Sequence, residues 1–340
     1  MIRFAFGYQL NGSESTADIV RDYRRSVAEV YFSWPGTPSA RALPGRRHGL
    51  SAAAARGIMY PELRAIRKMG VKLDLLLNAN CYGAGAVSRR LEREIITIIE
   101  RLGARTGGVD VVTTASPMAA RTVKKYFPGI EVRASVNMRI GTIPGLTYSR
   151  ELFDSYYIQR DIQRNLSQVR RLKKWADRNG KGLCMLANSG CLRYCPSQTF
   201  HDNLVAHDEE VAGADNVRDW NPHLCWSLYR DRKNWPAILQ ASWVRPEDLH
   251  HYDGLFKVVK LATRVHKHPR LVLHAYAQGK YRGNLLDLLE PGFGPAFAPC
   301  VVDNTRMPAG FFRRVSSCKA ECGSCRYCAR VLEKALVRCA

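Results

Sequence analysis

Three cysteines and one histidine lie within a single short segment, GLCMLANSGCLRYCPSQTFHDN at residues 182–203. The apolar run at 182–187 predicts a buried parallel strand, which the polar residues at 188–190 end. Cys191 and Cys195 follow this strand directly. Thiolates on a loop at a strand end can close on one metal centre, because the strand gives the loop a rigid base. The segment therefore predicts a thiolate-ligated metal site.

A first ligand set is formed by four cysteines, Cys184, Cys191, Cys195 and Cys225. Ligation by thiolates alone favours an iron-sulfur cluster or zinc over magnesium or calcium. We interpret the set as the ligands of a buried centre to which several loops contribute. The alternative is that Cys184, in the middle of an apolar strand, is a small core residue. Cys81, on another strand-end loop, could replace Cys184 or Cys225.

Polar residues at the ends of predicted strands, or just beyond the cysteines, are candidate catalytic residues that would contact a substrate: Asn78, Asn137, Arg160 and His201. His201 and His207 form a candidate acid/base pair, since an unperturbed imidazole titrates near neutrality. The simpler alternative is that both histidines bind loop backbone groups. Arg264, just beyond the last predicted strand, is a candidate anion contact or an ordinary surface arginine.

The C-terminal region carries the more specific metal pattern, C-x3-C-x2-C-x2-C at Cys318, Cys322, Cys325 and Cys328. Four cysteines so close together in a reducing compartment predict a metal site. A second iron-sulfur cluster and a structural zinc both fit this spacing. Known hydrolase motifs are absent from the sequence: no Gly-x-Ser-x-Gly elbow, no His-Glu-x-x-His helix and no phosphate-binding loop. Hydrolysis by the standard serine or zinc routes therefore has no support from the sequence.

The composition is strongly basic, with 52 Lys and Arg against 30 Asp and Glu and a formal net charge of +22. Such an excess suits a polyanion such as RNA or DNA, although a merely basic protein with no such ligand has the same composition. The first residues, MIRFAFGYQL, lack the features of a secretory signal. No segment reaches the ~18 apolar residues of a membrane span. We expect a cytoplasmic protein without membrane contact, where eleven cysteines indicate metal ligands or catalytic thiols rather than disulfides.

Short apolar runs alternate with amphipathic helical segments along most of the chain. Strands are predicted at 3–7, 29–34, 72–78, 109–114, 131–136, 155–158, 182–187 and 256–261. Helices are predicted at 16–27, 60–69, 88–102, 117–126 and 165–178, with a closing helix at 329–337. Eight strands with helices between most of them favour a closed (β/α)8 TIM-type barrel of the α/β class. An open doubly wound sheet is the alternative, but no glycine-rich dinucleotide motif follows any strand.

The chain divides into two predicted parts. Residues 1–290 form the α/β barrel with the iron-sulfur site, and residues 291–340 form a cysteine-rich C-terminal extension. From residue 292 the sequence is rich in Pro, Gly and Phe without a clear period. We expect this extension to be held together by its cysteines rather than by a core of its own.

Several segments resemble the U32 family of collagenase-like peptidases. They are the 182–203 segment with its GLC-x6-C and CP-x4-H-x-N elements, NANCYG, SVNMRI, SWVRPEDLHHY followed by KLATR, the helical segment AYAQGKYRGNLLDLL and the cysteine tail. The resemblance covers nearly the whole chain. Within it, Cys184 and Cys191 match the paired cysteines of the GLC-x6-C element. Cys195 and Cys225 stand where later ligands occur, at intervals that differ from those of the RNA-modifying members.

The resemblance implies an α/β barrel and a 4Fe-4S cluster held by four cysteines. Related proteins are oxygen-independent hydroxylases of tRNA or ribosomal RNA, some of which draw the hydroxyl from prephenate, or partners in ubiquinone hydroxylation. We therefore expect an Fe-S-dependent, oxygen-independent hydroxylase or related redox modifier, with RNA as the leading substrate. An electron-donor protein or a homologous protein is the expected partner. Two alternatives remain, a peptidase as the family name states and a non-catalytic Fe-S scaffold that acts with a partner.

Overall fold

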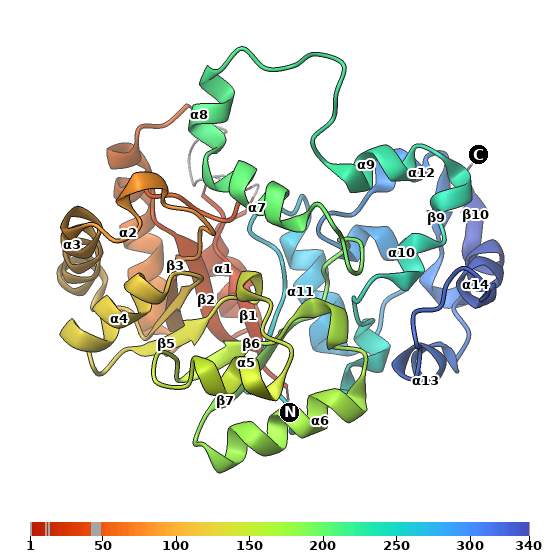
Figure 1. The fold of residues 1–340 in the computed structure, drawn as a ribbon, viewed down its shortest axis with the longest axis horizontal. Coiled ribbons are helices and arrows are strands. Elements are labelled where there is room, and N and C mark those ends of the chain that lie inside the picture. Colours follow the sequence, from red (N-terminus) through yellow and green to blue (C-terminus); the bar gives the residue numbers. More distant parts are fainter. Residues whose placement is uncertain (1, 11, 13, 42–48, 340) are drawn as a thin grey trace.

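The protein forms a closed barrel of parallel strands surrounded by helices (Figure 1), in a computed structural model that describes residues 2–10, 12, 14–41 and 49–339. The strands follow one another around the barrel in chain order, and β8 pairs with β1 to close it. This confirms the predicted (β/α)8 class. The strands are β1 (Phe4–Gly7), β2 (Val27–Ser33), β3 (Lys72–Leu77), β4 (Val111–Thr114), β5 (Glu131–Ala134), β6 (Ser155–Tyr157), β7 (Gly182–Leu186) and β8 (Val258–Lys260).

Helices pack around the barrel because their apolar faces cover the outward side chains of the strands. They are α1 (Thr16–Asp22), α2 (Ala52–Lys68), α3 (Arg89–Thr106), α4 (Pro117–Tyr126), α5 (Ile143–Tyr148), α6 (Leu166–Arg178) and α11 (Pro269–Gln278). Side-chain oxygens cap the N-termini of several of them and accept from backbone N–H groups that the helix leaves unpaired. These caps are Ser15, Ser51, Ser88, Ser116, Thr142 and Asn165.

The element boundaries differ from the predicted ones at a few helix ends. The predicted helix at 16–27 ends at Asp22, because the chain must turn before β2 begins at Val27. The helix predicted at 60–69 starts earlier, at Ala52 after its cap Ser51. Helix α11 ends at Gln278 because Gly279 adopts a left-handed conformation with φ 65°, so the expected helical segment does not continue through 289. Of the predicted loop at 37–51, residues 42–48 lie outside the described residues.

The barrel interior holds a layer of charged residues, although each of the strands involved is largely apolar. Arg133 in β5 is fully buried and its Nη2 donates to Glu29 Oε2 at 3.1 Å and to Glu131 Oε1 at 3.0 Å. Its Nη1 lies 3.9 Å from Asp74 Oδ2. Inward and outward side chains alternate along a strand, which explains how these groups face one another across the barrel. Buried charges are retained only when they are paired in this way.

The C-terminal part has a hydrophobic core of its own, so the expectation that cysteines alone hold it together is wrong. This core joins α9 (Leu224–Tyr229), α10 (Ala237–Gln240), α12 (Gly294–Phe297), α13 (Phe311–Ser316), α14 (Tyr327–Ala335) and the sheet of β9 (Cys300–Val302) with β10 (Leu336–Arg338). Figure 1 shows these elements gathered beside the barrel. Trp235 stacks on Phe297 with ring centroids 4.4 Å apart, which packs residues before β8 against the extension. The division at residue 290 stays a prediction.

Candidate functional site

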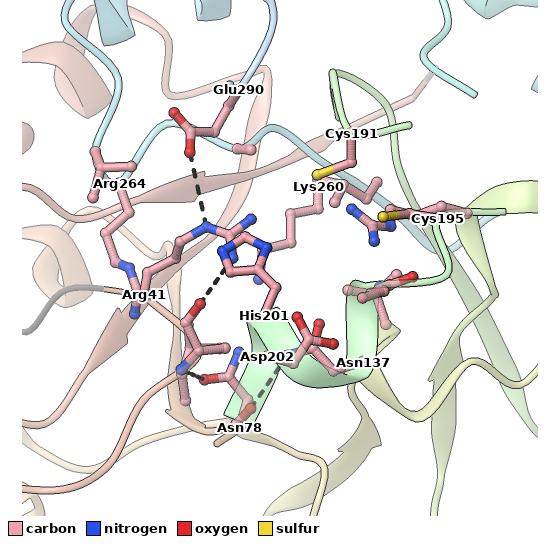
Figure 2. A pocket seen from close by; sticks show the side chains of 18 of the residues that line it. Arg41, Asn78, Asn137, Cys191, Cys195, His201, Asp202, Lys260, Arg264 and Glu290 are labelled. Atoms are coloured by element: carbon pink, nitrogen blue, oxygen red, sulfur yellow. Dashed lines mark hydrogen bonds and ion pairs between the residues drawn. The ribbon is translucent and has the colours of Figure 1, made fainter. Parts of the chain in front are cut away.

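A cavity of about 100 Å³ lies at the carboxyl ends of the barrel strands (Figure 2). This end of a TIM-type barrel carries the active site in enzymes of this fold. Tyr31, Leu76, Leu186 and Lys260 form its floor at the top of the barrel interior, and the loops that follow the strands form its walls. We call this space the mouth cavity. Its other lining residues include Arg41, Asn78, Asn137, Arg160, Cys191, Cys195, His201, Asp202, Cys225, Arg264 and Glu290.

The structure brings three of the four predicted ligand cysteines together and does not bring the fourth to them. Cys191 and Cys195 from the loop after β7, and Cys225 from α9, all line the mouth cavity. Figure 2 shows the sulfur atoms of Cys191 and Cys195 facing into it. Cys184 is buried inside the barrel beside Tyr157 and Val258 instead. Because side chains alternate along β7, Leu186 reaches the cavity floor and Cys184 points inward one layer below it. Burial raises the pKa of Cys184 to about 12, so its thiol stays protonated.

Positive charge favours a thiolate at one position in the mouth cavity. Burial by itself would raise the pKa of Cys191, but the guanidinium groups of Arg160 and Arg41 outweigh it and lower that pKa. Arg160 is held in place by a hydrogen bond from its Nη1 to Ser189 Oγ, at 2.9 Å. Burial raises the pKa of Cys225 to about 11 and also raises that of Cys195. Cys191 is therefore the thiol most easily ionised in this cavity.

The donor chemistry of the mouth cavity fits an iron-sulfur cluster. Thiolates are the donors that bind such clusters, and the nearby guanidinium groups balance the negative charge that thiolate ligation creates. Within the described part of the chain, no group of three or more His, Cys, Asp or Glu side chains is arranged to hold a metal ion. Ligation by Cys191, Cys195 and Cys225 therefore stays a prediction. All eleven cysteines have free thiols.

The four predicted catalytic residues, Asn78, Asn137, Arg160 and His201, all line the mouth cavity. Asn137 Nδ2 donates to the backbone oxygen of Asn78 at 3.4 Å, which ties the loops after β3 and β5 together. His201, from α7 (Gln198–Ala206), packs edge-on against His223 with ring centroids 4.7 Å apart. Burial, helped by the charge of Arg41 and by His223, lowers the pKa of His201 to about 4. His201 is therefore a neutral hydrogen-bonding group near pH 7, and an acid/base role stays a prediction.

We expect His201 to make folding stability depend on pH. The unfolded chain titrates this group near about 6.5 and the folded protein near about 4, so the unfolded chain binds the extra proton between these values. The stability that neutral His201 contributes is fully present at pH values above its pKa in the unfolded chain. It is lost as the pH falls toward its pKa in the folded protein. The free energy of unfolding should fall less on acidification from about pH 6.5 to about pH 4 in His201→Gln than in the wild type. With solvent screening, the difference is on the order of 1 kcal/mol. Urea unfolding at about pH 7 and about pH 4.5 measures it, with the exposed His274→Gln as control. An unchanged slope would contradict the prediction.

Lys260, Tyr31, Arg41, Asp202 and Glu290 also line the mouth cavity, and the sequence did not identify them. Lys260 lies with its Nζ 3.7 Å from the ring centroid of Tyr31, and burial lowers its pKa. Alternation along FKVVKL could have placed this lysine inside the barrel. Nothing in the local sequence brings Arg41 to Glu290, whose Oε1 lies 3.8 Å from Arg41 Nε. Arg264, the predicted anion contact, lines the cavity too.

A second arrangement of reactive side chains lies outside the mouth cavity. Cys81, on the loop after β3, is hydrogen-bonded to His207, and this bond with that from the Gly83 backbone lowers the pKa of Cys81. His207 Nδ1 lies 3.1 Å from Glu210 Oε2. A thiol, an imidazole and a carboxylate in this order form the pattern of an activated cysteine nucleophile. Cys81 is not among the residues that line the mouth cavity, and its role as a replacement ligand for Cys184 or Cys225 stays a prediction.

The C-terminal cysteines line a separate cavity of about 430 Å³, which we call the tail cavity. All four predicted tail ligands take part: Cys318, Cys322, Cys325 and Cys328. Basic and aromatic side chains complete the lining, among them Arg164, Arg193, Tyr194, Arg314 and Tyr327. The structure thus separates the predicted cysteines into two groups, as their positions in the sequence indicate. None of the described helices is both long and apolar enough to cross a membrane.

The fold and the mouth cavity define a (β/α)8 barrel protein whose strand-end loops carry a site lined by thiols and guanidinium groups. No family model matches the chain. The chain is 26% identical over 284 residues to an uncharacterised protease of Methanocaldococcus jannaschii, covering 81% of this chain and 80% of that protein. A solved U32 peptidase has the same fold, with a TM-score of 0.54 and 15% identity over 76% of this chain and 92% of that one. The chain is thus similar in sequence to this archaeal protein and in fold to a U32 peptidase.

Proposed function

We propose that the protein is an Fe-S-dependent, oxygen-independent hydroxylase that modifies RNA. The observation that supports this most is the convergence of Cys191, Cys195 and Cys225 on one cavity at the barrel mouth, beside Arg160 and Arg41. These three thiols would hold the cluster and leave one position for a further ligand. The cluster would supply one-electron redox chemistry at the end of the barrel where catalysis takes place in this fold.

The chain's own residues bind and orient the reacting groups in this proposal. Arg160 and Arg41 lower the pKa of Cys191, and Arg264 adds a third guanidinium for an anionic group of the substrate or oxygen donor. The side-chain amides of Asn78 and Asn137 can both donate to and accept from the edge of a nucleobase. Neutral His201 can accept a proton released in the reaction. With water as the source of oxygen, R–H and H2O give R–OH, two protons and two electrons, and an oxidised carrier of the ferredoxin or flavodoxin class would take up the electrons one at a time.

Exposed aromatic side chains in α7 and near it support RNA as the substrate. Phe200 in α7 and Trp220 are 51% and 61% exposed, and their ring centroids lie 6.0 Å apart. Tyr194, between two of the cavity cysteines, is 55% exposed. Aromatic rings stack on unpaired bases, while arginine and lysine side chains bind phosphates. The net charge of +22 adds to the electrostatic attraction.

We expect the double variant Phe200→Ala/Trp220→Ala to bind single-stranded RNA at least about tenfold more weakly than the wild type. Each stacked base contributes about 1–3 kcal/mol, and about 1.4 kcal/mol is a factor of ten. Fluorescence anisotropy with a labelled oligonucleotide at fixed salt measures the change. Tyr148→Ala removes a ring that is 86% exposed from α5, away from Phe200 and Trp220, and is the control. Equal weakening by both variants would count against a stacking role for Phe200 and Trp220.

Two measurements test the proposed function. Anaerobic purification should give a brown protein with about four iron atoms for each bound cluster. Mass analysis of RNA from cells lacking the protein should then show the loss of one hydroxyl modification, which the restored gene returns. A bound cluster without a lost modification would favour a scaffold that acts with a partner, and a protein without iron would overturn the proposal.

A peptidase is the second candidate, and the arrangement of Cys81, His207 and Glu210 is the observation that favours it. The name of the archaeal relative points in the same direction. In this case Cys81 would attack the peptide carbonyl after losing its proton to His207, and Glu210 would orient the imidazole. Casein or gelatin cleavage by metal-free protein, lost in Cys81→Ala and kept in Cys191→Ala, would establish this activity.

A further inference from the structure

The tail cavity is built to surround a negatively charged group. Its four thiols come from one segment of 11 residues, and three of them, Cys318, Cys322 and Cys325, are exposed. The cavity has a volume of about 430 Å³. Lys319 and Arg314 also line it together with one carboxylate, Glu321, so the charged side chains around the thiols are mostly positive.

One cationic side chain of the tail cavity, Arg164, has a nitrogen that makes no hydrogen bond. Arg164 is 3% exposed, and its Nε and Nη1 donate to the backbone oxygens of Trp243 at 2.7 Å and Leu239 at 2.9 Å. Its Nη2 is buried without any hydrogen-bond partner, and the side chain lines the cavity. An unpaired buried guanidinium nitrogen costs free energy unless a ligand accepts from it. Arg164 is therefore positioned to donate to an anionic group held by the thiols.

Two short segments form the wall between the tail cavity and the mouth cavity. In the loop after β7, Cys191 and Cys195 line the mouth cavity, whereas Arg193 and Tyr194 line the tail cavity. Two Cα steps separate Cys191 from Arg193, so their Cα atoms are at most about 7.6 Å apart. The segment 160–164 also lines both cavities, because Arg160 lines the mouth cavity and Arg164 lines the tail cavity.

Hydrogen bonds hold these two segments together. Arg193 Nε donates to the backbone oxygen of Asp161 at 2.9 Å, and the Tyr194 backbone N–H donates to Asp161 Oδ1 at 2.6 Å. The guanidinium carbon of Arg193 lies 4.8 Å from the ring centroid of Tyr194. These contacts fix the loop after β7, whose residues line both cavities, against the segment 160–164.

We propose that Cys318, Cys322, Cys325 and Cys328 hold a second 4Fe-4S cluster that carries electrons between the mouth cavity and a soluble redox partner. The relay rests on the proposed function, because hydroxylation with oxygen from a water-level donor releases two electrons. These leave one at a time: the oxidised tail cluster accepts one electron and passes it to an oxidised carrier of the ferredoxin or flavodoxin class. The exposed thiols and the basic rim suit a carrier with an acidic surface.

Metal content tests the site without reference to activity. We expect anaerobically purified wild type to contain about eight irons and eight sulfides per chain, and Cys322→Ser/Cys325→Ser about four of each. Cys339→Ser is the matched control, because it removes an exposed thiol that lines neither cavity. Zinc in the wild type that only the tail variant loses, or iron that the tail variant keeps in full, would overturn the proposal. Loss of four irons by the tail variant and none by Cys191→Ala would uphold the tail cluster while the mouth site fails.

Two further readouts keep the proposal testable if the double variant folds poorly. Arg164→Gln should retain the iron but lower the reduction potential of the tail cluster, because the reduced form loses a nearby positive charge; Arg164→Lys should restore it. After chemical reduction, oxidation of the mouth cluster by an added oxidised flavodoxin should be at least about tenfold slower in the tail variant. An unchanged potential in Arg164→Gln, or an unchanged oxidation rate, would overturn the relay.

Discussion

Replacing Cys191 by alanine should remove the cluster from the mouth cavity and abolish hydroxylation, while the tail metal persists. Cys191 is the thiol whose pKa Arg160 and Arg41 lower, so among the three that line the cavity it loses its proton to a metal most readily. Loss of a group that only supports a metal ligand costs about 10–100-fold in affinity or activity. Loss of a direct ligand should exceed this range. Iron and sulfide counts on anaerobically purified protein, with hydroxylation of RNA measured in parallel, give the result.

The control for this variant is Cys339→Ala, which removes a thiol that lines neither cavity and should leave both iron and activity unchanged. Circular dichroism of the two variants establishes that the barrel is intact in each. Unchanged iron in Cys191→Ala would defeat the assignment of the cluster to the mouth cavity. Lost iron with full hydroxylation would show that the cluster takes no part in the reaction.

Replacing Arg133 by methionine should lower the free energy of unfolding by about 3–5 kcal/mol. Arg133 is the cation that Glu29, Glu131 and Asp74 share inside the barrel. Methionine fills similar space but leaves the buried carboxylate of Glu29 without its bidentate partner. The desolvation cost of that charge is then no longer offset. Urea unfolding followed by circular dichroism measures the difference.

Lys173→Met is the control, because it breaks the ion pair with Asp177 on the surface of α6. Pairs of this kind contribute about 0.3–0.5 kcal/mol, so the control should change little. The double variant Glu29→Gln/Arg133→Met should be more stable than Arg133→Met alone, since the uncompensated charge is removed. A loss below about 1 kcal/mol for Arg133→Met would show that the carboxylates do not depend on this arginine.

Alternating strand and helix signals were sufficient to predict the barrel, because each signal is local. Every predicted strand lies within a few residues of an observed one, and apolar runs such as 72–78 and 182–187 mark strands that are covered on both sides. Strand-end loops were also predictable as the place of the site. This is why Asn78, Asn137, Arg160 and His201 all reach one cavity. Carboxyl ends of parallel strands meet at the same end of a barrel whatever their side chains are.

The tertiary structure decided which thiols share a site. Cys184 and Cys191 are close in sequence, but one side chain points into the barrel and the other into the mouth cavity. Which layer a strand residue occupies depends on the stagger between strands, and local sequence does not contain that information. The buried charges follow the same rule, since Glu29 in β2 and Arg133 in β5 become a pair only across the closed barrel.

The sequence by itself determined the fold class, the two groups of cysteines and the basic charge, because propensity, alternation and spacing are properties of neighbouring residues. Only the tertiary structure placed the unpaired Arg164 nitrogen beside the tail thiols and made residues 191–195 a wall between two cavities. The contacts that build this wall join residues more than 30 positions apart, such as Asp161 and Arg193, and Arg164 is held by Trp243, 79 positions away. Their positions follow from how the closed barrel packs against the C-terminal core.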